Sequence, residues 1–261
     1  FPTRRSSDLV LDGTNSMITD PFTMEPMGIT AENVAQRFGV TREEQDAFAL
    51  ESQRRAQEAL ANGAVADEIT PVVIKTRRGE EVIDTDEHPR AGLTLEKLAG
   101  MRPAFDAAGT VTAGNSSGIN DGACMLVLTR ASVAAERGLT PKAELVDFTK
   151  VGIEPEIMGY APKPAIEKIL DRNGVSVEQL GWIELNEAFA AQAIPIIRDL
   201  GLDEAKVNPL GGAIAWGHPI GATGIRMLAT LLHEMDRRKA RYGLESMCIG
   251  GGMGVSLALE R

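Results

Sequence analysis

The sequence predicts a layered α/β protein, on two observations. The first is the size and apolar content of the chain, which has 261 residues, 43% of them hydrophobic and 25% charged. These values are typical of a globular protein, and a chain of this length can bury a sizeable core in one or two domains. The second is the alternation of strand-like and helix-like segments from Ala143 onward, which is typical of α/β layers.

Composition narrows the class of protein. Lys and Arg total 27 and Asp and Glu total 37, for a net charge of −10, which argues against nucleic acid as a partner. No apolar run reaches the roughly 18 residues that a membrane span needs, and the first residues lack the apolar region of a signal peptide. The two cysteines are too few for a disulfide framework, so we expect a cytoplasmic protein. Its three histidines, without a cysteine cluster, predict no metal site.

Capping signals place two helices early in the chain. Thr30 is a suitable N-cap and Gly39 a stop for a helix over residues 31–38. Thr41 opens a capping box for a second helix, which extends through Ala61. Strands are expected at residues 70–76 and 82–84, and residues 85–118 are expected to be a long irregular stretch, which in a compact domain is usually functional.

Apolar runs and their flanking breakers predict the later elements. An apolar strand is expected at Cys124–Leu128, followed by a helix at residues 131–137. The further expected strands are residues 143–148, 182–185, 246–249 and 255–259, and the further expected helices are residues 164–172, 188–200 and 222–238.

Three short segments carry the residues suited to chemistry. Asn186 opens the segment Asn-Glu-Ala-Phe-Ala between a strand and a helix, where ligands bind in α/β sheets, although Asn is also a good helix cap. His218 lies in a glycine-rich segment that leads into a helix, a place that favours anionic groups; a lone histidine can equally be structural. Cys248 precedes a run of glycines, and its thiolate could act as base or nucleophile, although most free cysteines are small buried hydrophobes.

Neither glycine-rich segment predicts a nucleotide site. The spacing from Gly212 to Gly217 matches a P-loop, but His218 and Pro219 stand where Lys and Ser/Thr are required. The glycines at 250, 252 and 254 do not form GxGxxG and are followed by a strand. Taken together, the amide, the imidazole and the thiol are suited instead to acyl chemistry on a thioester.

From about Asp12 to Arg261, the chain resembles the thiolase family, the acetyl-CoA acetyltransferases and 3-ketoacyl-CoA thiolases. The matching stretches are residues 27–35, 102–105 and 112–122 together with the three segments above. The resemblance implies a thiolase-like layered fold with a mixed sheet between helices. It implies acyl-CoA and CoA as substrates, no cofactor, and a homodimer or homotetramer at full length.

The resemblance also implies roles for individual residues. Cys248 would be the acid/base cysteine, His218 would activate the acyl-accepting cysteine and help to bind the thioester oxygen, and Asn186 would hold a water beside it. The N–H of Gly250 would serve a second oxyanion hole. Residues implied in binding CoA and the acyl group are Ser117, Arg90, Lys97, Met101, Ala113, Phe105, Met27, Met158, Ala188 and Phe189.

The chain departs from this family in one respect. Thiolases carry a second reactive cysteine in a Cys-Gly-Ser/Ala-Gly context, which neither Cys124 nor Cys248 matches. We therefore expect an N-terminally truncated thiolase whose C-terminal half is complete, whose N-terminal half is mostly missing, and which is inactive alone. The expected parts are a tail (1–9) that resembles a translated sequencing adapter, a loop domain (10–118), a remnant of the N-terminal half (119–141) and the C-terminal domain (142–261).

Two other functions remain open. A non-catalytic thiolase-like protein that binds acyl-CoA or lipid would also lack the second cysteine. A nucleotide-binding module is disfavoured by both glycine segments.

Overall fold

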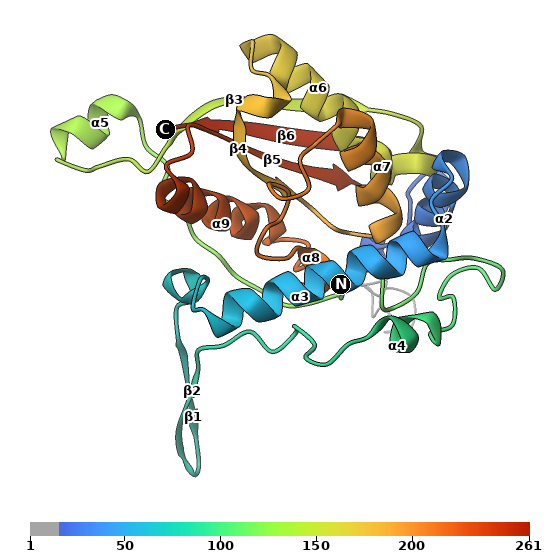
Figure 1. The fold of residues 1–261 in the computed structure, drawn as a ribbon. Coiled ribbons are helices and arrows are strands. Elements are labelled where there is room, and N and C mark those ends of the chain that lie inside the picture. The colour runs from blue at the N-terminus through green and yellow to red at the C-terminus, as the bar shows by residue number, and fades with distance from the viewer. Residues whose placement is uncertain (1–15) are drawn as a thin grey trace, which may run out of the picture.

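The computed structural model describes residues 16–261 and consists of one mixed sheet covered by helices on both faces (Figure 1). The sheet has the strand order β3-β6-β5-β4. Strand β4 runs parallel to β5, whereas β6 is antiparallel to both of its neighbours, β5 and β3. The strands are β3 (Glu144–Gly152), β4 (Leu180–Leu185), β5 (Tyr242–Ile249) and β6 (Met253–Glu260).

Two apolar layers cover the sheet. Adjacent residues of a strand point to opposite faces, and accordingly Ile183 packs with one cluster and Trp182 with the other. The Ile183 cluster includes residues of α6 (Pro162–Asn173) and α7 (Ala190–Leu200). The Trp182 cluster includes residues of α9 (Thr223–Arg238) and α3 (Arg42–Ala61).

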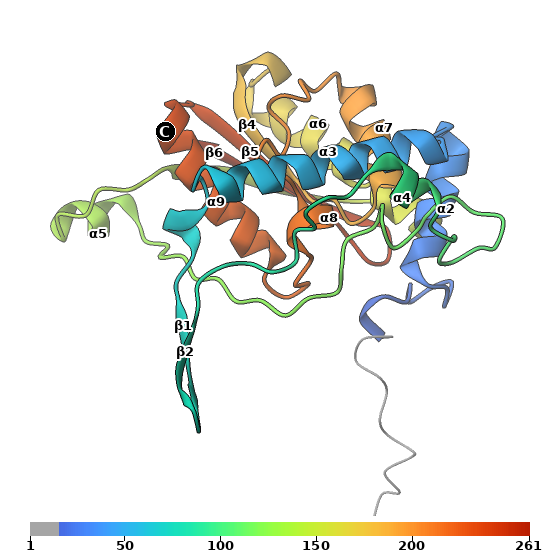
Figure 2. The ribbon, with the colours of Figure 1, turned by 60° about the horizontal axis from the view of Figure 1, so that its bottom comes forward.

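The early part of the chain wraps around this core. Helix α3 lies across the molecule beside the short helix α8 (Ala213–Trp216), and α2 (Met27–Phe38) packs near α7 (Figures 1 and 2). A hairpin of β1 (Val72–Thr76) and β2 (Gly79–Ile83) projects from the body, as does α5 (Ala131–Glu136) (Figure 2). The remaining elements are α4 (Leu95–Ala99) and the 3-10 helices η2 (Ala66–Glu68), η3 (Pro155–Tyr160) and η4 (Val177–Gln179).

Most expected elements are present, and one is not. The capping box of α3 forms as predicted, with the Thr41 N–H donating to Glu44 Oε2 at 2.7 Å and the Glu44 N–H donating to Thr41 Oγ1 at 3.2 Å. The first of the expected helices, α2, begins at Met27, so Thr30 lies inside it and is not the N-cap, as it was expected to be. The tail expected at residues 1–9 lies outside the described residues.

The strand expected at Cys124–Leu128 is absent, because the segment has no pairing partner. The sheet ends at β3 on one side and at β4 on the other, and no described strand pairs with residues 124–128. A strand is stable only when its backbone groups are paired with a neighbour. Three apolar side chains of the segment are instead 82–89% exposed: Met125, Val127 and Leu128.

Two buried carboxyl groups lie side by side in the sheet. Glu184 of β4 and Glu245 of β5 are register partners and are only 1–2% exposed. Burial raises the pKa of both carboxyls, and the charge of Arg226 opposes this. Trp182 Nε1 donates to Glu184 Oε1 at 2.8 Å, whereas Glu245 Oε2 has no partner among the described residues.

This pair predicts a pH-dependent stability. A carboxyl whose folded pKa lies above its unfolded value keeps a proton that the unfolded chain has lost, so the free energy of unfolding falls as the pH rises above about 4.5. Glu245→Gln removes this ionisation, and we expect it to raise the free energy of unfolding by about 1–3 kcal/mol at pH 8 and by much less at pH 5. Urea unfolding at the two pH values measures the effect.

Glu234 supplies the matched control. It is also buried, but it forms an ion pair with Arg237 at 2.6 Å. Glu234→Gln should therefore destabilise the protein at both pH values. An equal gain for Glu245→Gln at pH 5 and pH 8 would contradict the assignment.

Candidate functional site

Asn186 and Cys248 lie at the carboxyl ends of two neighbouring strands of the sheet. Asn186 directly follows β4, and Cys248 is the second-last residue of β5. Because β4 and β5 are parallel neighbours, their carboxyl ends lie together, which is the usual place for a site in an α/β sheet. The backbone N–H of Asn186 donates to the Ser246 carbonyl oxygen at 2.9 Å, which fixes Asn186 beside the end of β5.

The side chain of Asn186 belongs to the site and does not cap a helix. The N-cap of α7 is Phe189, and no side chain caps this helix. Asn186 is 1% exposed, and its Nδ2 lies 3.4 Å from His218 Nε2. Its Oδ1 is buried without a partner among the described residues. Such an atom is suited to accept a hydrogen bond from a water or a ligand.

His218 is positioned by the loop that follows Asn115. Its backbone N–H donates to the Gly118 carbonyl oxygen at 3.1 Å, and Ile119 forms a parallel bridge with it. Gly217 before it has φ = 89°, and a Cβ there would overlap the Asn120 side chain. The same loop contacts the other segment, since Ser116 bridges to Phe189. Residues 116–120 therefore hold the Asn186 and His218 segments together.

The hydrogen bonds of His218 define its tautomer. Thr223 Oγ1 donates to the Pro219 carbonyl oxygen at 2.9 Å, so it accepts from His218 Nδ1, which lies 2.6 Å away. His218 Nε2 is then the unprotonated nitrogen and accepts from Asn186 Nδ2. Burial, with a contribution from the positive charge of Arg226, lowers the pKa of His218 to about 4. The imidazole is therefore neutral at pH 7, with Nε2 available as a base.

Cys248 is a neutral thiol in this environment. Burial raises the pKa of Cys248 to about 11, opposed only by its own backbone N–H. No charged side chain of residues 16–261 contributes to this shift. At pH 7 the group therefore holds its proton and is suited to donate it, and it becomes a base only after donation. Its neighbour is the side-chain amide of Gln192, 3.9 Å from Sγ.

The glycine turn after Cys248 is held by residues near the beginning of the described chain. Gly251 and Gly252 have φ values of 81° and 84°, which favour glycine. Buried Asp20 accepts from the Gly251 N–H at 3.2 Å. Met27 contacts Gly250, the predicted oxyanion-hole residue. Sequence reasoning did not identify Asp20, whose partner lies more than 200 positions away.

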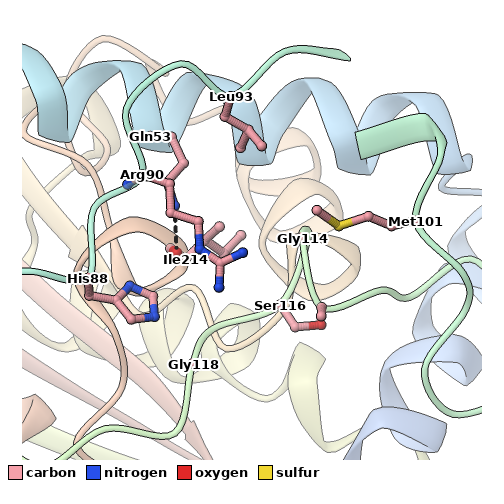
Figure 3. A pocket seen from close by; sticks show the side chains of 10 residues that line it. Gln53, His88, Arg90, Leu93, Met101, Gly114, Ser116, Gly118 and Ile214 are labelled. Atoms are coloured by element: carbon pink, nitrogen blue, oxygen red, sulfur yellow. Dashed lines mark hydrogen bonds between the residues drawn. The ribbon is translucent and has the colours of Figure 1, made fainter. Parts of the chain in front are cut away.

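A pocket beside this edge contains part of the predicted CoA-binding set (Figure 3). Arg90, Met101 and Ala113 line it, as expected for residues along a bound CoA. His88 also lines it and donates from Nδ1 to the Ala215 carbonyl oxygen at 2.8 Å, which leaves Nε2 free to accept. The pocket residues that sequence reasoning missed are Gln53, His88, Leu93, Gly114, Ser116, Gly118 and Ile214.

The other predicted binding residues are not among those that line the pocket. Ser117 donates its backbone N–H to the Ala188 carbonyl oxygen at 3.0 Å, and its neighbour Ser116 lines the pocket. Lys97 Nζ donates to the Gly92 carbonyl oxygen at 2.7 Å. Phe105 and Phe189 form an edge-to-face pair with ring centroids 6.1 Å apart.

Two further residues of the predicted set are part of the packed interior. Ala188 and Met158 are 6% and 3% exposed. Core packing accounts for both without a ligand. Their roles in binding stay predictions.

The second cysteine lies elsewhere. Cys124 is exposed, and its Sγ lies 3.5 Å from the Ile225 carbonyl oxygen of α9. Among residues 16–261, no cluster of His, Cys, Asp and Glu could hold a metal ion. Within the same residues, no helix is both long enough and apolar enough to cross a membrane.

Comparison with known families identifies both halves of the chain. Residues 139–261 match the model of the C-terminal domain of thiolase, and residues 3–132 match that of the N-terminal domain. The second match corrects the expectation that the N-terminal half is mostly missing, because N-terminal-domain sequence occupies the first half of this chain. That expectation treated the segments around Thr30 and Asn115 as a separate loop domain.

Several proteins that this chain resembles are described as acetyl-CoA acetyltransferases. An acetyl-CoA acetyltransferase from Thiocystis violacea is 53% identical over 254 residues, covering 97% of this chain and 64% of the relative. One from Paracoccus denitrificans is 54% identical, covering 93% of this chain and 62% of the relative. The crystal structure of the Bacillus anthracis acetyl-CoA acetyltransferase has a TM-score of 0.93 at 47% identity, covering 95% of this chain and 63% of that one. The chain thus spans slightly less than two thirds of the length of these proteins.

A second solved structure extends the likeness beyond these enzymes. Human mitochondrial 3-ketoacyl-CoA thiolase has a TM-score of 0.89 at 40% identity, covering 95% of this chain and 63% of that one. The overall fold is therefore common to proteins of both descriptions.

Proposed function

Since the chain belongs to the thiolase family, we propose that its site performs acyl transfer between coenzyme A thioesters, forming or cleaving a 3-ketoacyl-CoA. The observation that carries the proposal is the continuous set of contacts from Cys248 through Gln192 and Asn186 to His218 at the ends of two parallel strands. This set offers a proton donor, a neutral base and an unpartnered acceptor in one place.

His218 and Asn186 act on the thioester oxygen and on the acyl acceptor. His218 Nε2 takes the proton of the acyl-accepting thiol, and the resulting N–H then donates to the thioester oxygen. Asn186 Oδ1 accepts from a water, which donates its other hydrogen to the same oxygen. The buried, unpartnered Oδ1 supports this role.

Cys248 moves the protons of the reaction. As a thiol, it protonates the CoA sulfur that leaves when the acyl group is transferred to the acceptor. The thiolate that remains removes the α-proton of acetyl-CoA, and the electron pair moves to the thioester oxygen to form an enolate. The enolate carbon attacks the bound acyl carbonyl, whose developing charge the Gly250 N–H stabilises, and the acceptor thiolate leaves. The thiol form at pH 7 suits the first of these steps.

The acyl-accepting thiol is, in this proposal, not one of the two cysteines of this chain. Cys248 serves as acid and base, and Cys124 lies exposed against α9. We therefore expect no complete turnover from the 261 residues alone. A homodimer or homotetramer and action without a cofactor stay predictions from the family, and cytoplasmic location stays a prediction from the cysteine count.

A second candidate function has one observation in its favour. A protein that binds acyl-CoA without catalysis needs the pocket but no acceptor thiol, and this chain has the pocket without that thiol. The two functions differ in whether Cys248 moves a proton of the bound acyl group.

Protection of Cys248 by CoA tests whether the pocket binds the proposed substrate. In a Cys124→Ser background only Cys248 reacts with iodoacetamide. We expect millimolar CoA to slow this reaction at least tenfold and Arg90→Ala to weaken the protection several-fold, because Arg90 lines the pocket and its guanidinium is suited to bind a phosphate group. Mass spectrometry of the alkylated chain measures both rates.

The control is Arg78→Ala in the exposed turn between β1 and β2. It removes the same charge away from the pocket and should leave protection unchanged. Alkylation that is insensitive to CoA would contradict both candidate functions.

A further inference from the structure

A buried amide stands between the two catalytic segments. Gln192 lies in the first turn of α7 and is completely buried. Its side chain is within hydrogen-bond distance of the Asn186 carbonyl oxygen, and it lies 3.9 Å from Cys248 Sγ. It is thus the one described side chain with a recorded contact to the sulfur.

The contacts of Gln192 define which end of the amide faces the sulfur. With Nε2 donating to the Asn186 carbonyl oxygen at 3.2 Å, Oε1 accepts from the Ala193 N–H at 3.3 Å, and both ends have partners. The opposite orientation would place Oε1 against the carbonyl oxygen of Asn186. Buried polar groups are hydrogen-bonded in native structures, so the first orientation is the stable one. In it, the NH₂ group is the end beside Cys248 Sγ.

We propose that Gln192 is a positioning residue that stabilises the thiolate of Cys248 by donating a hydrogen bond to the sulfur. An amide NH₂ has two hydrogens: one is used by the Asn186 carbonyl and the other is free for the sulfur. Hydrogen bonds to an ionised acceptor are about twice as strong as neutral ones, so the contact strengthens when the thiol loses its proton. This role rests on the proposed function, in which the Cys248 thiolate is the base that removes the α-proton.

The described residues around the Cys248 sulfur include little else that could stabilise a thiolate. Burial disfavours the thiolate, and no charged group of the described residues compensates for it. The imidazole of His218 is neutral and is held between Thr223 and Asn186. On the side of α7, the nearest polar partner of Cys248 is therefore the neutral amide of Gln192. The same amide contacts both the Asn186 carbonyl oxygen and Cys248 Sγ, and it therefore helps to hold these two residues at a constant distance.

Alkylation of Cys248 tests the proposal without any acyl-CoA. In the Cys124→Ser background, the rate of reaction with iodoacetamide at pH 8 is proportional to the thiolate fraction. Gln192→Met keeps the length and bulk of the side chain but removes the donor, and we expect a rate about 5–10-fold lower, the effect of a pKa higher by somewhat less than one unit. Gln192→Glu places an acidic group beside the sulfur and should lower the rate further.

Gln45→Met supplies the matched control. Gln45 is another completely buried glutamine, whose Nε2 donates to Thr110 Oγ1 at 2.9 Å. Its loss should affect stability but leave the alkylation rate of Cys248 unchanged. Circular dichroism and thermal unfolding identify any variant that does not fold, and the 240 nm absorbance of the thiolate gives its pKa independently of steric access.

The outcomes separate this proposal from the proposed function. The order wild type, Gln192→Met, Gln192→Glu in falling rate supports the hydrogen bond, whether or not the chain acts on acyl-CoA. A folded Gln192→Met variant that reacts as fast as wild type, or faster, and has the same thiolate absorbance profile would overturn it. CoA protection in wild type would stand in either case.

Discussion

The Cys248→Ala variant is expected to lose all catalysed exchange of the acetyl-CoA methyl protons with D₂O. In the proposed reaction, the Cys248 thiolate removes an α-proton while the water bound to Asn186 donates to the thioester oxygen, and this step needs no acyl acceptor. General-base catalysis of this type contributes about 10²–10⁴-fold, so removal of the base should return the rate to background. Proton NMR of acetyl-CoA incubated with the chain measures the exchange.

The pH dependence sharpens this prediction. Burial raises the pKa of Cys248 to about 11, so only a small thiolate fraction is present near neutrality. That fraction, and the exchange rate with it, should rise about tenfold per pH unit between about pH 7 and pH 9. His218, whose pKa is lowered to about 4, does not change its charge in this range. A Cys124→Ala variant should match wild type throughout.

Two results would contradict the assignment of the base. Exchange that is independent of pH would point to another group, and exchange that persists in Cys248→Ala would exclude Cys248. Exchange absent from wild type while CoA protects Cys248 would instead favour the non-catalytic binding protein.

The sequence predicted those parts of the fold that depend on local signals. The capping box at Thr41 formed because both of its partners lie within one helical turn. Strand and helix alternation after Ala143 appeared in the expected order, because strand β4 and helices α6, α7 and α9 each have a clear apolar pattern. The strand expected at Cys124–Leu128 failed because a strand also requires a neighbour, which no local pattern reports.

Some residues of the candidate site could likewise be predicted from local sequence, and others could not. The segments of Asn186, His218 and Cys248 were identified by residue type, and the structure brings Asn186 and His218 into contact. Asp20 was not identified, because its partner Gly251 is distant in sequence. Thr223 and Gln192 were not identified, because each bonds a nearby residue from the first turn of a helix, as many polar residues do. Only the fold shows which of many such residues faces the site.

Gly252→Ala is expected to have the largest effect on the stability of the glycine turn. Gly252 has φ = 84°, and a Cβ at this position would overlap the Ile153 carbonyl oxygen and approach Pro155 N at 3.1 Å. These are backbone atoms, which cannot rotate away as a side chain can. Left-handed strain of about 1–2 kcal/mol and overpacking of about 1–3 kcal/mol should together lower the free energy of unfolding by about 2–5 kcal/mol.

Gly174→Ala separates the two contributions. Gly174 ends α6 with φ = 61°, and a Cβ there would meet nothing within 4 Å. This variant should lose only the strain of about 1–2 kcal/mol in urea unfolding. Equal losses in the two variants would show that overlap with the Ile153 carbonyl contributes nothing.

The turn variant also affects the chemistry. The Ile153 N–H donates to the Gly252 carbonyl oxygen at 2.7 Å, and the Gly251 N–H donates to Asp20, so the turn is held from both sides. A Cβ at position 252 must displace one of these contacts, and Gly250 and Cys248 lie only two and four positions before Gly252. Gly252→Ala should therefore expose Cys248 and accelerate its alkylation while weakening protection by CoA. Gly174→Ala should change neither rate, because a Cβ there meets nothing within 4 Å and the adjoining Asn173 donates to Asp147 of β3, not to the glycine turn.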